Sequence, residues 1–388
     1  MKTQTALPQP SPDALAHSAR VVDHVRAEIA RAGGWLDFAR YMELVLYAPG
    51  LGYYSAGARK LGPDGDFTTA PELTPLYGQC VAQQARQVLE LGLDQVLEVG
   101  AGSGALAASL LEELDRMGAV PRSFLILELS ADLRARSRDL LAARVPHLME
   151  RIAWLNVLPP AFSGMVIGNE VLDAMPVHVV RATAEGIEEG GVVVAGHGEA
   201  PFAWAFRPAG GALRDAAGEL GLAPGYTTEL ALAARGFVRS LAGMLERGIA
   251  LFVDYGFPSH EYYHPQRSTG TLMCHYRHRA HGDPFFLPGL QDVTAHVDFS
   301  AVARTAADAG LDVLGYANQA QFLVNCGITD LMLRVPPEDV ARYAPQAAAA
   351  NKLLSPAEMG ELFKAIALGR GVEGPLAGFA AGDRRHTL

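Results

Sequence analysis

The sequence predicts a doubly wound α/β fold, in which a mostly parallel sheet carries helices on both faces. Three observations support this fold class. Apolar strand-like runs alternate with amphipathic helical stretches from residue 95 to residue 254, and a glycine-rich loop directly follows the first of these runs. Hydrophobic residues make up 49% and charged residues 19% of the 388-residue chain, so a sizeable core can form. Buried strands separated by helices are typical of a parallel sheet.

The individual elements follow from periodicity and from start and stop signals along the chain. Short apolar runs are expected to be buried strands, and longer stretches with apolar residues three or four positions apart are expected to be helices. The expected strands are 95–99, 123–129, 151–155, 164–168 and 248–254, and the expected helices are 19–31, 75–91, 103–117, 131–144 and 228–246. Between residues 177 and 206 the pattern changes to short glycine-rich runs, which indicate an inserted antiparallel lobe.

The same signals divide the chain into four regions. A flexible polar leader is expected first, followed by an N-terminal helical cap, the main α/β domain and a C-terminal helical extension. Their expected bounds are 1–18, 19–92, 93–330 and 331–388. Within the main domain we expect the β-rich insertion at about 177–225 and a substrate loop at about 257–298.

Composition argues against several classes of function. The formal net charge of −10 argues against broad binding to nucleic acid, which needs clustered lysine and arginine side chains. An acidic surface suits a basic substrate, although the same charge can serve solubility alone. No run of about 18 apolar residues is present, so we expect no membrane span.

Cysteine usage and the N-terminal residues bear on the compartment. Cys80, Cys274 and Cys326 are scattered and lack CxxC spacing, as expected in a reducing compartment without a disulfide framework. The N-terminal residues lack the apolar segment of a secretory signal and the Arg-rich pattern of a mitochondrial import signal. We therefore expect a cytoplasmic location.

The sharpest signal is the loop Glu98-Val-Gly-Ala-Gly-Ser-Gly104 between the first strand and the next helix. Gly100, Gly102 and Gly104, with Ser103 between them, allow a tight turn and let a ligand approach the backbone. The following helix presents free N–H groups and partial positive charge at its N-terminus. We expect this loop to bind a cofactor, and a simple strand–helix turn is the alternative.

Two cofactors fit these glycines. Gly100, Gly102 and Ala105 also satisfy the GxGxxG/A fingerprint of NAD-binding domains. Glu98 can meet the ammonium group of a methionyl moiety, and the third glycine gives the E-x-G-x-G-x-G form of class I methyltransferases. Glu128 ends the second strand, where a carboxylate can accept both ribose hydroxyls of either cofactor. We expect S-adenosylmethionine, with NAD as the alternative.

Polar residues crowd the end of the fourth strand, in Asn169-Glu-Val-Leu-Asp173. Ligands of open α/β sheets bind at the carboxyl ends of the strands, so Asn169 is expected to contact the cofactor. Glu170 and Asp173 are candidate catalytic residues, because carboxylates can grip a planar guanidinium and offset its charge during methyl transfer. For Asp173, capping of a following helix is an equal alternative.

Further polar residues follow the fifth strand. Asp254 and Tyr255 end that strand near the same crevice. His296 is a third candidate catalytic residue, and a packing histidine is the alternative. Asp298 precedes a helical stretch that it can cap.

A run of histidines invites a metal interpretation. His275, His278 and His281 recur at three-residue spacing beside Cys274. Methyl transfer needs no metal, and no nearby acid completes a ligand set. We therefore expect no metal site and interpret the run as part of a polar substrate loop.

Taken together, these segments resemble the MidA-like family, whose mitochondrial member is a respiratory complex I assembly factor with protein arginine methyltransferase activity. The shared motifs are Tyr41-Met to Tyr53-Tyr54, Gly65-Asp-Phe-Thr-Thr-Ala-Pro-Glu-Leu-Thr-Pro75, Glu98 to Gly104, Asn169-Glu-Val-Leu-Asp-Ala-Met-Pro-Val177, Asp254-Tyr-Gly256, Gly270-Thr271 and Asp292-Val-Thr-Ala-His-Val-Asp-Phe299. They cover most of the chain from about residue 20 to residue 330.

The resemblance implies more than the residues alone. It points to a protein arginine side chain as the methyl acceptor, and the family's best-known target is a complex I subunit. It also implies that the segment with Gly65, Asp66, Phe67 and Thr68 folds over the cofactor and closes it from solvent. Glu170 sits in the place of the acidic loop that grips the guanidinium in arginine methyltransferases.

A second arginine methyltransferase feature is matched less closely. Thr294-Ala-His296 looks similar to the Thr-His loop of those enzymes, but the intervening alanine departs from the pattern. The resemblance therefore leaves the role of His296 open.

We thus expect a Rossmann-like class I methyltransferase domain with a seven-stranded sheet, an N-terminal helical cap and an inserted β-rich lobe. The expected function is S-adenosylmethionine-dependent methylation of arginine in a protein partner. A cofactor-binding scaffold protein without turnover and a small-molecule methyltransferase are the alternatives. The sequence does not fix the oligomeric state, for which a dimer is one option.

Overall fold

The computed structural model describes residues 7–56, 69–196 and 200–388. The described chain forms two compact units, each assembled from three separate stretches of sequence. The first unit takes its residues from Met1–Phe67, Ala174–Ala234 and His260–His296, and the second from Thr68–Asp173, Arg235–Ser259 and Val297–Leu388. Each unit has its own sheet and its own cluster of buried apolar side chains.

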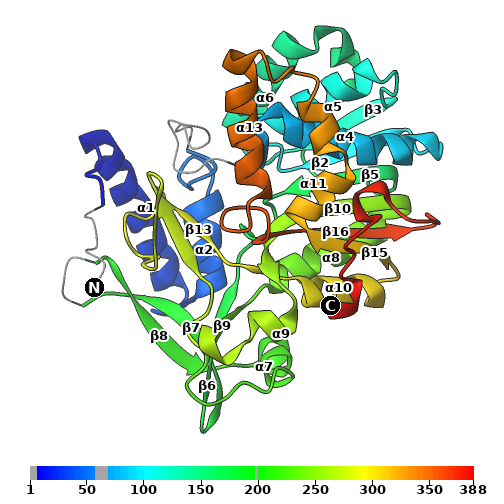
Figure 1. Cartoon of the computed structure of the whole chain (residues 1–388). Coiled ribbons are helices and arrows are strands. Elements are labelled where there is room, and N and C mark those ends of the chain that lie inside the picture. Colours follow the sequence, from blue (N-terminus) through cyan, green and yellow to red (C-terminus); the bar gives the residue numbers. More distant parts are fainter. Residues whose placement is uncertain (1–6, 57–68, 197–199) are drawn as a thin grey trace. The chain divides into compact units, whose positions relative to one another are not determined.

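The second unit contains the predicted doubly wound sheet (Figure 1). Seven strands run in the order β15-β16-β10-β5-β2-β3-β4. Their bounds are β2 (Gln95–Val99), β3 (Ser123–Leu127), β4 (Ile152–Leu155), β5 (Phe162–Asn169), β10 (Leu245–Phe257), β15 (Asp312–Asn318) and β16 (Phe363–Arg370). A short strand, β14 (Val297–Asp298), pairs with the end of β10. The pairs among β4, β3, β2, β5 and β10 are parallel, and β16 is antiparallel to both of its neighbours.

The order in which strands are added reverses at β2. From β2 the chain adds β3 and β4 on one side, and then β5 and β10 on the other. In open α/β sheets such a reversal leaves a crevice at the carboxyl ends of the strands, where ligands bind. The glycine loop after β2 and the polar residues after β5 and β10 therefore share one edge of the sheet.

Several helices of the second unit begin after a capping side chain. Thr74, Ser130, Asp298 and Asn318 each accept a backbone N–H of the helix that follows, which confirms the capping role expected for Asp298. The bounds are α3 (Ala70–Leu73), α4 (Pro75–Glu90), α5 (Ala105–Arg116), α6 (Ala131–Arg144), η1 (Pro146–Arg151), α8 (Leu232–Met244), α10 (Phe299–Asp308), α11 (Gln319–Asn325), α12 (Ile328–Met332), α13 (Val340–Leu354), η3 (Ala377–Phe379) and η4 (Arg385–Thr387). Among all the helices that the structure describes, none is both long and apolar enough to cross a membrane.

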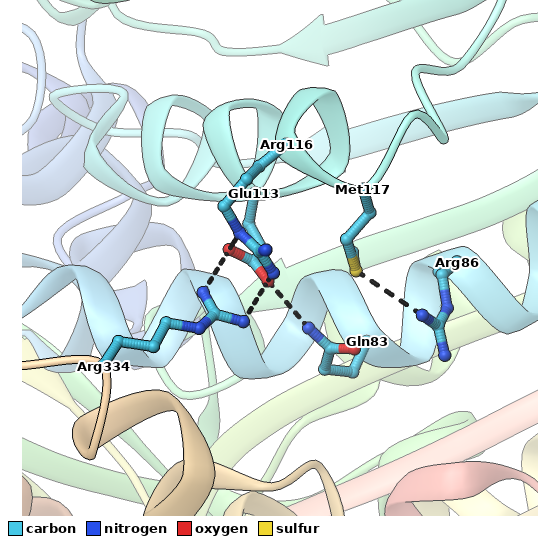
Figure 2. Close-up of polar contacts among 6 residues, drawn as sticks. All are labelled: Gln83, Arg86, Glu113, Arg116, Met117 and Arg334. Atoms are coloured by element: carbon cyan, nitrogen blue, oxygen red, sulfur yellow. Dashed lines mark hydrogen bonds and ion pairs between the residues drawn. The ribbon is translucent and has the colours of Figure 1, made fainter.

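A buried carboxylate connects three of these helical segments (Figure 2). Glu113 of α5 is only 2% exposed and accepts paired hydrogen bonds from Arg116 on its own helix and from Arg334, which follows α12. Gln83 of α4 donates a further hydrogen bond at 2.9 Å. Burial alone raises the pKa of Glu113, but the hydrogen bonds and charges of Arg116 and Arg334 outweigh burial and hold the pKa at about 2.

The first unit is built around a second, antiparallel sheet. Its strands are β1 (Leu36–Asp37), β6 (His178–Thr183), β7 (Gly186–Val194), β8 (Phe202–Pro208) and β9 (Thr227–Leu230). A three-stranded sheet contains β11 (Met273–Tyr276), β12 (Arg279–His281) and β13 (Asp292–Thr294). The helices are α1 (Pro12–Arg31), α2 (Phe38–Tyr47), α7 (Gly211–Gly218), α9 (Ser259–Tyr262) and η2 (Pro265–Arg267). The expected antiparallel insertion is therefore confirmed.

This unit differs from the predicted division of the chain. The cap, the insertion and the substrate loop were expected as separate regions, but they contribute to one compact unit. β1 of the cap pairs with β7 of the insertion. The helix expected at 19–31 begins earlier, at Pro12, because Ser11 caps it and a proline fits the first turn. The leader at 1–18 was therefore predicted too long.

The prediction of a helical extension at 331–388 was wrong for its second half. Helix α13 lies in this region, but β16 is an interior strand between β10 and β15. The side chains of β16 are alternately small and branched, and nearly all are buried. Alanine favours helices when considered alone, so pairing on both sides of the strand decides the outcome. Likewise, the helix expected at 228–246 is preceded by β9 and begins at Leu232.

Candidate active site

The glycine loop has the backbone that the sequence predicts. Gly100, Gly102 and Gly104 all have positive φ angles, of 69°, 55° and 87°. Gly104 is also sterically crowded, because a Cβ at this position would lie 2.9 Å from the Cβ of Ser137. Glycine is therefore required here both by the backbone angle and by the neighbour. Helix α5 begins at the next residue and directs its free N–H groups toward the loop.

Glu98 is a buried carboxyl group beside this loop. It is 2% exposed, and its Oε2 atom has no hydrogen-bond partner among the residues that the structure describes. Burial, with a smaller contribution from the charge of Glu128, raises the pKa of Glu98 to about 8. A buried carboxyl oxygen without a hydrogen-bond partner is costly in an isolated protein. The site is therefore suited to a cationic group of a ligand, such as the ammonium of a methionyl moiety.

Glu128 follows β3, at the same edge of the sheet. Its Oε2 accepts the N–H of Gly102 at 3.0 Å, and its Oε1 accepts the N–H of Ser130 at 2.9 Å. Burial raises the pKa of Glu128, and these backbone hydrogen bonds oppose that shift. These backbone groups orient the carboxylate, and its remaining acceptor capacity can take a ribose hydroxyl group of a ligand.

Ser103 connects the loop to α3. Its hydroxyl group donates a hydrogen bond to Glu72 and accepts the N–H of Ala105 at 3.3 Å. Glu72 lies in the second half of the Gly65–Pro75 motif. The candidate cofactor residues Gly65, Asp66, Phe67 and Thr68 lie outside the described residues.

Asn169 and Glu170 lie together at the end of β5. The amide Nδ2 of Asn169 donates to Oε1 of Glu170 at 3.1 Å, and its Oδ1 accepts the hydroxyl group of Tyr77 from α4. Glu170 has a φ angle of 54°, which non-glycine residues rarely adopt, and its N–H donates to the carbonyl of Val253 on β10 at 2.9 Å. Strained residues of this kind are concentrated at functional sites.

Asp173 is buried next to Asp254 of β10. The exposed fractions are 4% and 0%, and the two carboxyl groups are in hydrogen-bonding contact. Burial, followed by the charge and hydrogen bond of Asp173, raises the pKa of Asp254 well above its ordinary value. The alternative role of Asp173 as a helix cap is wrong, because residues 171–177 form a turn that leads into β6.

His296 belongs to the first unit, whereas Glu170 and Asp173 belong to the second. The backbone N–H of His296 donates to the hydroxyl group of Thr271 at 3.1 Å. Thr271 is in turn held by Glu229, a buried carboxyl group that accepts the N–H and hydroxyl of Thr271 and the N–H of Leu272. The backbone around His296 is thus fixed within its own unit.

The histidine run forms a hairpin. Arg277 and His278 occupy the two turn positions between β11 and β12, with φ angles of 47° and 59°, and His281 pairs with Cys274 across the ladder. The three-residue spacing therefore reflects the turn. Among the described residues, the histidine run does not form a cluster of possible metal ligands. Such a cluster is formed by Asp37, His178 and Glu189 of the first unit, whose possible metal-binding atoms lie within 4.8 Å of one another. His178 and Glu189 are joined there by a 2.8 Å hydrogen bond.

Three residues of this site were not among the predicted site residues. Tyr77 lies on the buried face of α4, where an aromatic residue is normally interpreted as core. Glu72 could have been found from its place in the Gly65–Pro75 motif. The sequence analysis placed Asp254 at this edge, because the carboxyl ends of adjacent parallel strands meet there, but assigned it no role.

Comparison with known proteins assigns the family. Residues 79–317 match the model of a family described as S-adenosyl-L-methionine-dependent methyltransferases. This match contains the glycine loop and the ends of β3, β5 and β10.

Two crystal structures of Burkholderia thailandensis proteins resemble the whole chain. One, described as bound to S-adenosyl-homocysteine, is 53% identical, covers 99% of this chain and 100% of its own, and has a TM-score of 0.95. The other, a native structure, has the same identity and coverage and a TM-score of 0.92.

Curated relatives agree with this assignment. The mitochondrial protein arginine methyltransferase NDUFAF7 homolog of Drosophila melanogaster is 28% identical, over 94% of this chain and 88% of its own. The human mitochondrial protein arginine methyltransferase NDUFAF7 is 27% identical, over 87% of this chain and 81% of its own. These matches confirm the resemblance found in the motifs, and the chain belongs to the family of S-adenosyl-L-methionine-dependent methyltransferases.

Proposed function

We propose that this methyltransferase transfers the methyl group of S-adenosylmethionine to a guanidinium nitrogen of an arginine side chain in a protein. The observation that carries the proposal is the oriented carboxylate of Glu170 at the end of β5. Its carboxylate follows the end of β5, its side chain is oriented by Asn169, and its backbone is held in a strained conformation by Val253. Curated relatives named as protein arginine methyltransferases support the choice of acceptor.

The residues around the glycine loop fit the cofactor. Glu98 offers a buried acid for the ammonium group, and the glycines leave room for the ligand beside the backbone. Glu128 offers a carboxylate, already oriented by Gly102 and Ser130, for the ribose hydroxyls. When bound there, S-adenosylmethionine supplies a methyl group on a positively charged sulfur. A nitrogen lone pair can attack this methyl group, and the sulfur leaves as a neutral thioether.

Glu170 is suited to hold the acceptor for this displacement. A carboxylate binds a guanidinium through two parallel hydrogen bonds, which fixes the plane of the group and therefore the direction of its nitrogen lone pair. Holding the reacting atoms in line is the main contribution that a protein can make to such a transfer. The negative charge of Glu170 also offsets the positive charge of the guanidinium, and its carboxylate can accept the proton that the nitrogen loses as it gains the methyl group.

The proposal is tested with tritium-labelled S-adenosylmethionine and cell extract, followed by acid hydrolysis and separation of methylated arginines. Wild-type protein should label arginine in the protein fraction. Glu170→Gln should lower the rate about 100-fold or more, because the amide cannot form the ionic fork. Glu150→Gln, at an exposed glutamate, is the matched control and should keep wild-type activity.

Other outcomes separate the alternatives. Label in a small-molecule fraction alone would assign a metabolite acceptor instead. A scaffold protein would bind S-adenosylhomocysteine and a partner without transferring label, and Glu170→Gln would leave partner binding intact. Either result would contradict the proposed acceptor.

The expected partner and location extend this proposal. A subunit of respiratory complex I is the protein acceptor that the MidA-like resemblance suggests, and the cytoplasm is the expected site of action. Purified complex I subunits as acceptors in the same assay, and cell fractionation, test these two points. The oligomeric state, with a dimer as one option, can be measured by analytical ultracentrifugation.

A further inference from the structure

The pair formed by Asp173 and Asp254 has no obvious role in binding the cofactor or the acceptor. Both side chains are almost fully buried, and their carboxyl groups are in hydrogen-bonding contact. Two adjacent carboxylates in a buried site cannot both carry a charge without strong repulsion. Such a pair titrates as a unit and holds one proton between its members.

Asp254 also contacts the backbone of the loop that carries Glu170. Its Oδ2 accepts the N–H of Leu172 at 3.3 Å, and its Oδ1 accepts the N–H of Asp173 at 3.4 Å. The neighbouring residue on β10, Val253, accepts the N–H of Glu170. Two neighbouring residues of β10 therefore hold the loop 170–173 at both of its ends. Val253 holds the N–H of Glu170, directly after β5, and Asp254 holds the N–H groups of Leu172 and Asp173.

We propose that Asp254 is a positioning residue, which shares one proton with Asp173 and thereby holds the loop 169–173 in the conformation that aims Glu170. This inference rests on the proposed function, in which Glu170 grips the acceptor. Asp173 then acts on the reaction through the backbone of the loop. The arrangement explains why Glu170 can keep a positive φ angle, since strained residues persist only where their surroundings fix them.

The groups that surround the pair define what else can affect its proton. Glu170 lies on the same loop, and its negative charge raises the pKa of Asp254 further. Tyr77 of α4 donates its hydroxyl group to Asn169, and burial and the charges of Glu170 and Asp254 keep its pKa well above the ordinary value, so this hydroxyl group stays protonated. From β16, Lys364 lies opposite Asp254 in the strand ladder, and its ammonium group donates to the carbonyl of Glu361.

The test compares two substitutions of one residue. Asp254→Asn keeps one acceptor oxygen, enough for one of the two loop N–H groups, and supplies an N–H that can donate to the carboxylate of Asp173, as the protonated acid does. Asp254→Ala removes both. We expect Asp254→Asn to keep kcat within about threefold, and Asp254→Ala to lower kcat about 10- to 100-fold while the Kd for S-adenosylhomocysteine changes less than about threefold. Asp312→Asn, at an exposed position of β15, is the control and should match the wild type.

The pH profile of kcat separates a shared proton from a merely structural contact. At alkaline pH the wild-type pair loses its proton, the two charges repel, and kcat should fall. Asp254→Asn has no proton to lose at this position, so its alkaline decline should be absent. The inference is overturned if Asp254→Asn loses as much activity as Asp254→Ala, or if it keeps the alkaline decline of the wild type.

A measurement without turnover keeps this inference distinct from the proposed function. In protein labelled with ¹³C-aspartate, infrared difference spectra should contain the band of one protonated aspartic acid near neutral pH. That band should be absent in Asp254→Asn and in Asp173→Asn, and present in Asp312→Asn. Its persistence in both pair variants would overturn the inference even if arginine methylation were established, and its loss would support the shared proton even if the acceptor were different.

Discussion

Glu98 should make the affinity for cofactor product depend on pH in a defined way. Burial and the nearby charge of Glu128 raise its pKa to about 8 in the free protein. Only the charged carboxylate can pair with the ammonium group of S-adenosylhomocysteine. Below pH 8, binding must therefore remove a proton from Glu98, so affinity rises as the pH rises toward the pKa and levels off above it.

The magnitude follows from this linkage. Each pH unit below the pKa lowers the affinity by up to a factor of ten, or about 1.4 kcal/mol. Between about pH 6 and pH 8 the Kd should therefore fall by about 50-fold, with roughly one proton released for each molecule bound at the acidic end. Isothermal titration calorimetry in buffers with different ionisation enthalpies measures both quantities.

Two variants complete the experiment. Glu98→Gln carries no titrating group, so its Kd should vary little across the same pH range. Glu150→Gln, on the surface, should keep the wild-type slope. A wild-type Kd that changes less than about threefold, or a Glu98→Gln variant that keeps the full slope, would refute the assignment of Glu98 to the ammonium group.

Three further predictions concern stability and positioning. Glu113→Gln should destabilise the fold by about 2–3 kcal/mol near neutral pH. This difference should disappear as the pH falls from about 4.5 to about 2, because the wild-type carboxylate becomes protonated in that range. Chemical denaturation at several pH values measures the difference. Gly104→Ala should lower stability by about 2 kcal/mol or more and weaken S-adenosylhomocysteine binding. Gly118→Ala is the control, at an uncrowded glycine with a φ of 67°, and should cost only about 1 kcal/mol. Equal losses of stability in thermal unfolding would contradict the steric argument. Tyr77→Phe removes the hydrogen bond to Asn169 and should lower kcat about tenfold without changing the Kd for S-adenosylhomocysteine; a change in Kd alone would assign Tyr77 to cofactor binding.

The sequence predicts the sheet core and the glycine loop because their signals are local. A continuous apolar run, three closely spaced glycines and a helix start lie within a dozen residues, from Gln95 to Ala105. The same reasoning finds the carboxylates after β3 and β5, since each directly follows a strand. It also predicts the cap at Asp298, because a capping side chain acts on the next turn of its own helix.

Features that depend on distant pairing were not predictable in this way. The pairing of Leu36 with Val192 joins segments more than 150 residues apart, and nothing in either segment indicates the partner. The contact between Tyr77 and Asn169 likewise depends on how α4 packs against β5. The three-residue spacing of the histidines reflects a hairpin turn, but the sequence does not identify that turn. The positive φ angles of Arg277 and His278 identify it in the structure.

The interior position of β16 has a consequence for how the chain folds. This strand begins at Phe363, yet it separates β10 from β15 and pairs with β10 along eight consecutive residues. While the polypeptide emerges from the ribosome, β10 must wait with an unprotected hydrogen-bonding edge until more than 100 further residues have been made. Long-range closure of this kind is slow, and unpaired strand edges promote aggregation. Synthesis rate and chaperone supply should therefore limit the yield of active protein more strongly than the stability of the finished fold.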